Sequence, residues 1–224
     1  MCYIECDISD TNGQIAVVFI TLWLMMPAYL ANTIAVITGG RFPIDQGKMH
    51  SDGNRILGDG KTWSGLLGGT IGGIIVGYVQ LNFGTSFMES LLNSPYRIYY
   101  FDTFWGGNPL LTFFLLSFGA LLGDLTASFF KRRQNLGRGA KYPLLDMYDF
   151  IVMSLLLINI GSFVAYFMIE LVGGTEYDGP YLLYLIWSGG WWNVPLFTLL
   201  IVTPILHRGV NIIGYKIGVK NEPW

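Results

Sequence analysis

The chain has 224 residues, of which 52% are hydrophobic and only 12% are charged, and its mean hydropathy is +0.48. Soluble domains carry about 25% charged residues, so this chain has too little polar surface to cover a water-soluble globule. The formal net charge of −2 provides no basic surface overall, and we expect no nucleic-acid partner. Composition therefore predicts an integral membrane protein.

Five segments are long and apolar enough to cross a bilayer as helices, which requires about 20 mostly apolar residues. The first could be mistaken for a signal peptide, but no basic residue precedes it and its apolar run is too long for that role. The sequence thus predicts an all-α fold, a single polytopic membrane domain over 1–224. The predicted spans are 15–37, 65–83, 110–130, 150–172 and 184–206.

The loop after the first span, 38–64, is rich in charge and glycine. Its stretch Gly60-Lys61-Thr62 matches the end of a phosphate-binding P-loop. That motif also requires glycine where Arg55 stands, and it follows a buried strand, whereas no β-rich run occurs here. The loop is therefore not a P-loop, although the same residue types suit phosphate and metal ions.

This loop runs directly into the second predicted span. Thr62 or Ser64 could cap that helix, and a helix N-terminus attracts anions. We therefore expect the loop to cradle phosphate groups at the inner membrane face, with ordinary salt bridges in a solvated loop as the alternative. The residues expected to bind substrate here are Arg55, Asp59, Lys61 and Thr62, and Arg55 and Lys61 are the ones expected to hold phosphate.

Glycine recurs at every fourth residue of the second span. Small residues at this spacing let helix backbones approach closely in lipid. The pattern predicts helix packing, and it is not a dinucleotide-binding fingerprint because no βαβ unit surrounds it. The glycines concerned are Gly65, Gly69, Gly73 and Gly77, with Gly68 and Gly72 forming a second row.

The third span carries a carboxylate, Asp124, roughly two turns inside its predicted inner end. A charged group at such a depth is costly and usually marks a functional site. Ser128 and Lys131 follow four and seven residues later, so the three side chains share one face of a helix. The alternative is that Asp124 only pairs with Lys131 or with a polar group of another span.

The segment 131–149 joins the third and fourth spans and combines two carboxylates with a basic cluster. Asp146 and Asp149 are three residues apart, so they face the same way if this turn is helical. Helix capping is the alternative role for either of them. The basic residues of the segment are Lys131, Arg132, Arg133, Arg138 and Lys141.

We expect Asp124 to approach Asp146 and Asp149 from the preceding helix. Mg²⁺ prefers carboxylate oxygens together with substrate phosphate oxygens, and basic side chains neutralise the remaining phosphate charge. The sequence thus predicts that these three carboxylates hold Mg²⁺ and, together with Lys131, form the catalytic group. The substrate-binding residues expected beside them are Ser128, Arg132, Arg133, Arg138 and Lys141.

The basic residues are distributed unequally between the two sides of the predicted bundle. Of the 13 Lys and Arg residues, the first loop holds four, the segment 131–149 five and the C-terminal tail three, whereas the loop between the second and third spans holds only Arg97. Cytoplasmic loops carry the excess of positive charge. The N-terminus is therefore expected outside and the C-terminus in the cytoplasm, with the cytoplasmic loops 38–64 and 131–149 forming the site.

At these residues the chain resembles the CDP-archaeol synthase family, CTP-dependent archaeal enzymes of ether-lipid synthesis that are related to CDP-diacylglycerol synthase. The matching motifs recur in order and cover most of the residues on the predicted cytoplasmic side. They are PAYLAN (27–32), PIDQG (43–47), DGNRILGDGKTWSGLLGG (52–69), GDLTASFFKRR (123–133) and RGAKYPLLDMYDF (138–150).

The resemblance implies a cytidylyltransferase in the cell membrane, with its active site at the cytoplasmic face. The expected substrates are CTP and an isoprenoid glycerol phosphate lipid, 2,3-bis-O-(geranylgeranyl)-sn-glycerol 1-phosphate, and the products are unsaturated CDP-archaeol and pyrophosphate. Mg²⁺ would stabilise charge on the phosphates. The attacking lipid phosphate is already an anion, so neither His50 nor His207 needs a catalytic role.

Three alternatives remain open from the sequence. The chain could act on another lipid phosphate, like CDP-diacylglycerol synthase. It could be an ion-coupled carrier that uses Asp124, although carriers usually show repeated halves and no internal repeat occurs here. It could also be a scaffold with a basic inner face, which leaves Asp146 and Asp149 without a role.

Overall fold

The computed structural model describes residues 11–84, 109–137, 140–173 and 193–218. Within these ranges the chain is helical, and the two isolated β-bridges, Pro43 to Thr62 and Met49 to Arg55, belong to one loop. The helices are α1 (Thr11–Leu24), α2 (Met26–Thr38), α3 (Trp63–Val79), the π-helical turn η1 (Gln80–Gly84), α5 (Leu110–Arg133), α6 (Pro143–Leu171) and α8 (Val194–Lys216).

Within the described residues, five helical stretches are long and apolar enough to cross a membrane, which confirms the predicted fold class at this level. They are Gln14–Thr38, Trp63–Phe83, Leu110–Arg133, Pro143–Leu171 and Val194–Lys216. Helix α6 begins earlier than the predicted span, so Asp146 and Asp149 lie in its first two turns. Helix α8 continues to Lys216, and the predicted positions 184–192 lie outside the described residues.

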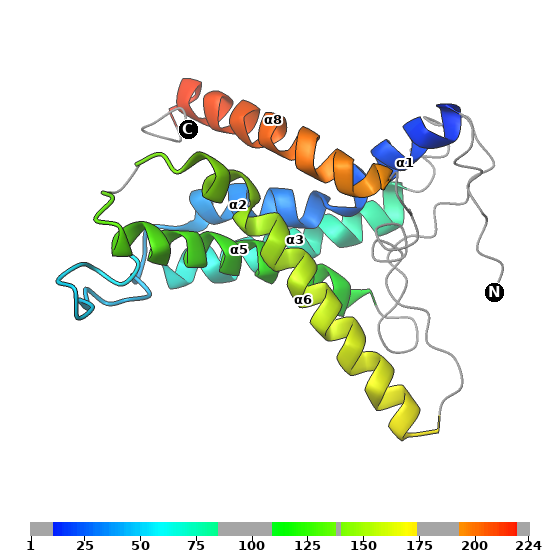
Figure 1. Ribbon diagram of the computed structural model, residues 1–224, viewed down its shortest axis with the longest axis horizontal. Helices are drawn as coiled ribbons and strands as arrows, with labels where there is room; N and C mark the ends of the chain where they lie inside the picture. The colour runs from blue at the N-terminus through cyan, green and yellow to red at the C-terminus, as the bar shows by residue number, and fades with distance from the viewer. Residues whose placement is uncertain (1–10, 85–108, 138–139, 174–192, 219–224) are drawn as a thin grey trace.

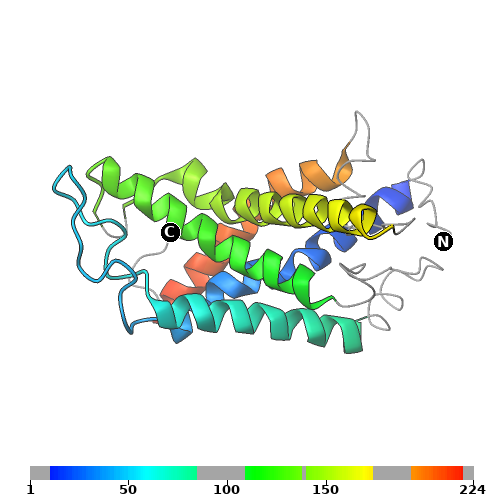
Figure 2. The same ribbon diagram turned by 90° about the horizontal axis from the view of Figure 1, so that it is seen from below.

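Helices α2, α3 and α5 run side by side and form the packed centre of the molecule (Figure 1). Helix α6 packs on α5 near its start and then diverges from it, while α8 crosses above and contacts α1 and α6. The loop between α2 and α3 and the connection between α5 and α6 lie at the same end of the bundle (Figure 2). The C-terminal half of α8 points toward that end as well.

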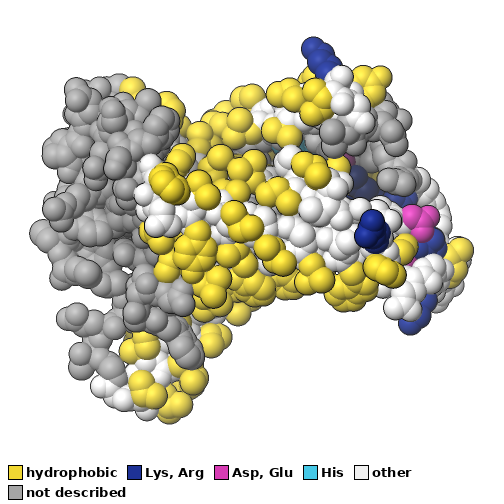
Figure 3. Space-filling model, turned by 180° about the vertical axis from the view of Figure 1, so that it is seen from behind, with side chains coloured by type: hydrophobic (Ala, Val, Ile, Leu, Met, Phe, Trp, Pro, Cys, Tyr) yellow, Lys and Arg dark blue, Asp and Glu magenta, His cyan; other side chains and the backbone are white. Residues whose placement is uncertain are grey.

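Side-chain chemistry divides the surface along the length of the bundle. On the face shown in Figure 3, hydrophobic side chains cover the middle of the molecule, and the charged side chains gather at the end that carries the loops. Many large apolar side chains of the helices are exposed, among them Ile71, Ile75, Phe163 and Ile201. An exposed apolar surface of this extent is what lipid contact requires.

Glycine positions in α3 allow its backbone to touch two neighbouring helices. A Cβ atom at Gly69 would lie 2.7 Å from the Ala31 carbonyl oxygen of α2, and one at Gly73 would lie 2.8 Å from the Pro27 carbonyl oxygen. A Cβ at Gly73 would also overlap Ser117 of α5. These contacts confirm that the glycine repeat serves helix packing.

A proline breaks the first membrane-crossing stretch between α1 and α2. Pro27 has no N–H, so the carbonyl of Trp23, four residues earlier, loses its helical partner. The Gln80 side chain of η1 donates to this Trp23 oxygen over 2.7 Å. The hydrogen bond joins two spans at the end of the bundle that lies opposite the loops.

A second proline, in α8, also leaves a backbone carbonyl without its helical donor, and a different side chain supplies the hydrogen bond. Pro204 lies inside the helix and leaves the carbonyl of Leu200 without its backbone donor. The Tyr148 hydroxyl of α6 donates to that oxygen over 2.6 Å. A further hydrogen bond of 2.7 Å joins Tyr29 of α2 to Thr203. Polar side chains therefore attach α8 to the rest of the bundle.

Candidate functional site

The loop between α2 and α3, residues 39–62, is organised around one carboxylate. Asp45 has a fully buried side chain and accepts backbone hydrogen bonds from Gly47, Leu57 and Gly58 at 3.2, 3.0 and 2.8 Å. Arg55 donates to both of its oxygens, at 3.1 and 2.6 Å. This Arg55 hydrogen bonding is the main reason why the pKa of Asp45 lies below its usual range.

The remaining amino group of the Arg55 guanidinium, Nη1, pairs with a second carboxylate. The Nη1 atom lies 2.9 Å from Asp59, whose side chain is 69% exposed. Both carboxylates raise the pKa of Arg55, with the Asp45 hydrogen bonds contributing most. Arg55 is thus fixed to the loop on its Asp45 side, and its Asp59 side is open to exchange with another anion.

Two arginines at the end of α5 join this helix to the loop. Arg133 donates to Asp52 over 2.8 Å and to the Arg55 carbonyl over 2.6 Å, and its guanidinium carbon lies 5.0 Å from the centre of the Phe129 ring. Arg132 donates to the Leu57 carbonyl over 3.4 Å. These contacts place the loop over the C-terminal end of α5.

The last residues of the loop position a lysine against α5. Thr62 caps α3, because its side-chain oxygen accepts a hydrogen bond from the Gly65 N–H over 3.2 Å. Of the two caps considered from the sequence, Thr62 and Ser64, the structure therefore has Thr62. Lys61 directly precedes this cap, and its amine forms an ion pair with Asp124 of α5. The deep carboxylate therefore pairs with the loop, and not with Lys131.

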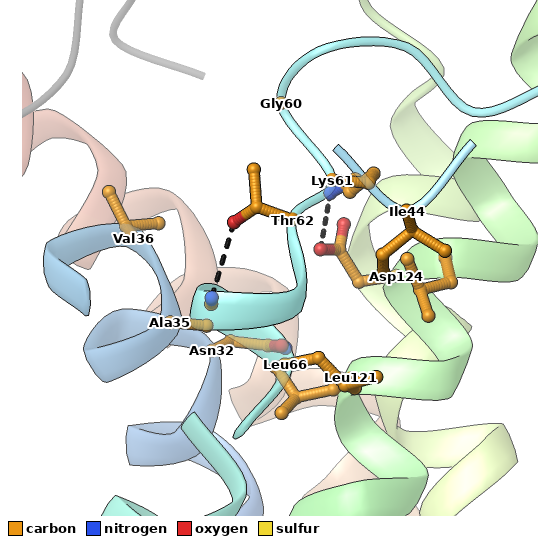
Figure 4. Close-up of a pocket in the computed structure, with 12 residues that line it drawn as sticks. Asn32, Ala35, Val36, Ile44, Gly60, Lys61, Thr62, Leu66, Leu121 and Asp124 are labelled. Atoms are coloured by element: carbon orange, nitrogen blue, oxygen red, sulfur yellow. Dashed lines mark hydrogen bonds and ion pairs between the residues drawn. The ribbon is translucent and has the colours of Figure 1, made fainter. Parts of the chain in front are cut away.

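The Lys61–Asp124 pair lies at the edge of a pocket enclosed by α2, α3 and α5 (Figure 4). The space between its walls, including the open mouth, amounts to about 420 Å³. Its wall combines apolar side chains, among them Ala35, Leu66 and Leu121, with the polar side chains of Asn32 and Thr62. A pocket with apolar walls and a few charged groups is the usual form of a small-molecule site.

The other two predicted metal ligands lie at the start of α6. Asp146 pairs with Lys131 through one oxygen and accepts from the Tyr142 N–H over 3.0 Å through the other. Asp149 accepts from the N–H of Phe150 over 2.6 Å. Asp146 therefore has a helix-capping contact as well as an ion pair.

A close helix contact brings Asp149 toward Asp124. A Cβ at Gly123 would lie 2.7 Å from the Phe150 Cα and would overlap the Asp149 carbonyl group, so α5 and α6 touch through their backbones. The backbone of Asp149 thus lies against Gly123, the residue that precedes Asp124. Within the described residues, however, no three carboxylate, His or Cys side chains are grouped closely enough to hold a metal ion.

The remaining predicted residues occupy different environments. Ser128 is buried in α5 and Lys141 is exposed just before α6. Arg138 lies outside the described residues. The importance of Asp45 for the loop and of Gly123 for the α5–α6 contact was not predicted. The only local signal for Asp45 was its position in the charged, glycine-rich loop, and Gly123 directly precedes the deep carboxylate.

Comparison with known proteins identifies the family. The model of the family described as CDP-archaeol synthase, CarS-like, matches residues 14–173. The chain belongs to the CDP-archaeol synthase family. A CDP-archaeol synthase from Methanocorpusculum labreanum is 42% identical over 201 residues, covering 89% of this chain and all of that protein. One from Thermococcus gammatolerans is 39% identical, covering 95% of this chain and 99% of that protein.

The fold is also similar to that of a solved intramembrane enzyme, described by the words "Structural insight into an intramembrane enzyme for archaeal membrane lipids biosynthesis". The TM-score is 0.54 at 29% identity, over 85% of this chain and 92% of that chain. The family match includes all the predicted site residues and ends at 173, before α8. Family membership confirms that the chain is a nucleotidyltransferase of lipid biosynthesis and a multi-pass membrane protein.

Proposed function

We propose that this chain transfers CMP from CTP to 2,3-bis-O-(geranylgeranyl)-sn-glycerol 1-phosphate, giving unsaturated CDP-archaeol and pyrophosphate. An oxygen of the lipid phosphate attacks the α-phosphorus of CTP, and the bond from that phosphorus to the oxygen bridging to the β-phosphate breaks. The observation that carries this proposal is the Lys61–Asp124 pair beside a pocket at the charged end of membrane-crossing helices, in a chain of this family.

The reaction needs charge stabilisation more than proton transfer, because the attacking phosphate is already anionic. Lys61 and Lys131 each form an ion pair with a carboxylate. We infer that both amines turn to phosphate oxygens when CTP binds, where they stabilise the charge that develops on the leaving pyrophosphate. Arg55 would also contact the phosphates, through the Nη1 amino group that pairs with the exposed Asp59 carboxylate.

The loop arginines have a supporting part in this proposal. Arg132 and Arg133 hold loop carbonyls and Asp52, so they keep Lys61 and the Thr62 cap in place over α5. Lys141 and Arg138, which sequence analysis also assigned to phosphate, remain proposed contacts of the triphosphate. Ser128 is proposed as a hydrogen-bonding partner of substrate from the inner face of α5.

We propose Mg²⁺ as the cofactor, with Asp124, Asp146 and Asp149 as the oxygen donors. Their chemistry fits this ion, since Mg²⁺ is commonly held by one or two carboxylates together with substrate phosphates and water. Bound Mg²⁺ would neutralise phosphate charge and orient the triphosphate. Release of the two lysines to CTP would free Asp124 and Asp146 to act as ligands, which is consistent with their separate pairing here.

The orientation in the membrane is part of the same proposal. The loop 39–62 and the α5–α6 connection share one end of the bundle, and with most basic residues at that end we place it in the cytoplasm. In a variant without native cysteines, an impermeant thiol reagent applied outside intact cells should label Asp178→Cys and spare Ser51→Cys. Labelling of Ser51→Cys alone would reverse the orientation.

The activity is tested with the purified protein in vesicles that contain the lipid phosphate. With CTP labelled at the α-phosphate, label should enter the lipid and one pyrophosphate should be released per lipid product, only when Mg²⁺ is present. Phosphatidic acid serves as the comparison substrate. Preferred use of phosphatidic acid would move the function to a CDP-diacylglycerol-synthase-like activity, and absence of any transfer would contradict the proposal.

A further inference from the structure

The pocket beside Lys61 contains a polar side chain that the proposed chemistry does not use. Asn32 of α2 lines this pocket, and in Figure 4 its amide points between the helices toward Leu66 and Leu121. Its Oδ1 atom is buried and has no hydrogen-bond partner among the residues that the structure describes. A buried amide oxygen without a partner is costly, and such a group in a native fold calls for an explanation.

No described residue donates a hydrogen bond to the Asn32 Oδ1, which leaves this acceptor available to a ligand. Ala35, Leu66 and Leu121 of the pocket wall have no side-chain hydrogen-bonding group, and the wall also includes Lys61, Thr62 and Asp124. Thr70 of α3 donates to the Leu66 carbonyl over 2.8 Å, whereas the buried hydroxyls of Thr112 and Ser117 in α5 also have no partner among the described residues. Neither of those two lines the pocket, and Asn32 does.

Polarity differs between the two ends of the pocket. Lys61 and Asp124 stand at one end, where charge suits a phosphate. The end near Asn32 is bounded by apolar side chains, which suit a flat, weakly polar group and would disfavour a desolvated phosphate. A nucleoside triphosphate has this division within one molecule, since its base is planar and its phosphates are charged.

We propose that Asn32 is the base-recognition residue, and that its Oδ1 accepts a hydrogen bond from the exocyclic amine of cytosine. Cytosine carries an N4 amine donor on that edge, whereas uracil carries an acceptor at the same position. The inference rests on the proposed function, because it assigns one subsite within the CTP site. Apolar walls from α3 and α5 would contact the faces of the ring while Lys61 meets the phosphates.

The test separates the base from the phosphates. KM values for CTP and UTP and the inhibition constant of inorganic tripolyphosphate are measured for wild type, Asn32→Leu and Lys61→Ala. For Asn32→Leu we expect the CTP KM to rise about tenfold or more and the preference for CTP over UTP to disappear, while tripolyphosphate inhibits as in wild type. Lys61→Ala should weaken all three phosphate ligands and keep the nucleotide preference.

Two further variants make the result interpretable. Asn82→Leu removes an exposed amide of η1 at the other end of the bundle, where Asn82 donates to the Tyr78 carbonyl, and should leave both the KM values and the preference unchanged. If Asn32→Leu does not fold, Asn32→Asp decides, since it keeps the acceptor and loses the donor. This variant should use UTP even less, relative to CTP, than wild type does.

Three outcomes would overturn the assignment while leaving the proposed function intact. The first is an unchanged preference for CTP in a folded Asn32→Leu protein, or in Asn32→Asp where that variant decides. The second is equal weakening of CTP, UTP and tripolyphosphate, which would indicate a structural role. The third is a change confined to the KM of the lipid phosphate, which would assign the pocket to the lipid. A wild-type protein that transfers no CMP would instead overturn the proposed function itself.

Discussion

The glycine-lined centre and the charged end of this molecule are held together by different interactions. In the centre, the α3 backbone at Gly69 and Gly73 meets backbone carbonyls of α2 and side chains of α5 at very short range. At the charged end, the carboxylates of Asp59 and Asp124 pair with cations while remaining 69% and 43% exposed. The centre is therefore suited to fixed geometry, and the charged end is suited to exchanging internal ion pairs for a ligand.

The largest effect is expected from filling the glycine contact. Gly73→Leu places a side chain against Ser117 and the Pro27 carbonyl, where even a Cβ has no room, so α3 must separate from two helices. Overpacking of this kind costs about 1–3 kcal/mol and occasionally more, and here the obstacle is partly backbone. Thermal unfolding in detergent measures it. Ile75→Leu on the exposed face of α3 is the control, and equal melting temperatures for the two variants would contradict close packing at Gly73.

At the charged end, removal of the loop carboxylate should be the most damaging single change to structure. Asp45→Asn leaves Arg55 without its bidentate partner and weakens three backbone hydrogen bonds, at about 1.5–3 kcal/mol for hydrogen bonds to a charged group. The loop should then become accessible to protease while the helices persist. Asp59→Asn, which removes only an exposed partner, should alter proteolysis far less.

Acid should have the same effect on the wild-type loop. Because folding lowers the pKa of Asp45, its contribution to loop stability is fully present above the unfolded value of about 4 and is lost as the pH falls through the lower folded value. Protease sensitivity measured at successively lower pH should therefore begin to rise in wild type below about pH 4, continue to rise as the pH falls toward the folded pKa, and stay high throughout in Asp45→Asn. A loop in wild type that opens as the pH is raised would contradict this linkage.

The exchangeable ion pair should affect catalysis and leave the fold intact. Lys61→Ala removes an amine proposed to reach the phosphates, and the loss of a charge-assisted hydrogen bond amounts to about 1.5–3 kcal/mol, or roughly 10- to 150-fold in transfer rate at limiting CTP. The melting temperature should change little, because this pair is partly exposed. Normal CTP kinetics in folded Lys61→Ala would remove the residue from the site.

The smallest expected effect concerns the attachment of α8. Tyr148→Phe leaves the Leu200 carbonyl, freed by Pro204, without its donor, and hydrogen bonds between membrane helices contribute about 0.6 kcal/mol on average, with a maximum near 1.7. The melting temperature should fall slightly. Adding Pro204→Ala restores the backbone donor, so the double variant should recover. A Tyr148→Phe effect that Pro204→Ala does not reduce would show that the hydroxyl has another role.

Features with a local signature were predictable from the sequence, and features created by distant contacts were not. The five membrane-crossing helices follow from runs of apolar residues, the packing of α3 from glycines four residues apart, and the Thr62 cap from its place before the helix. The pairing of Lys61 with Asp124 joins residues 63 positions apart. Sequence spacing carries no information on such a contact. The sequence alone therefore could not show that Asp124 pairs with Lys61 and not with Lys131, which is nearer along the chain.

The hydrogen bonds that compensate for the two helix prolines could not be predicted from the sequence either. The helix interruption at Pro27 and that at Pro204 can be expected from the residue type. Their remedies, Gln80 on the Trp23 carbonyl and Tyr148 on the Leu200 carbonyl, depend on which helices become neighbours. Asn32 is a related case, since its significance follows only from the pocket that α2, α3 and α5 enclose.

The central claim is that the carboxylates of Asp124, Asp146 and Asp149 at the charged end hold Mg²⁺ for CMP transfer. The most direct test is Mg²⁺-dependent turnover and melting temperature measured on the same purified Asp124→Asn, Asp146→Asn and Asp149→Asn proteins. The account predicts that Asp124→Asn and Asp146→Asn each lose about 100-fold or more in turnover, the scale of losing one electrostatic contact to the transition state, and still melt near the wild-type temperature. Near-normal turnover in both, with lowered melting temperatures, would show that these carboxylates only stabilise the helices.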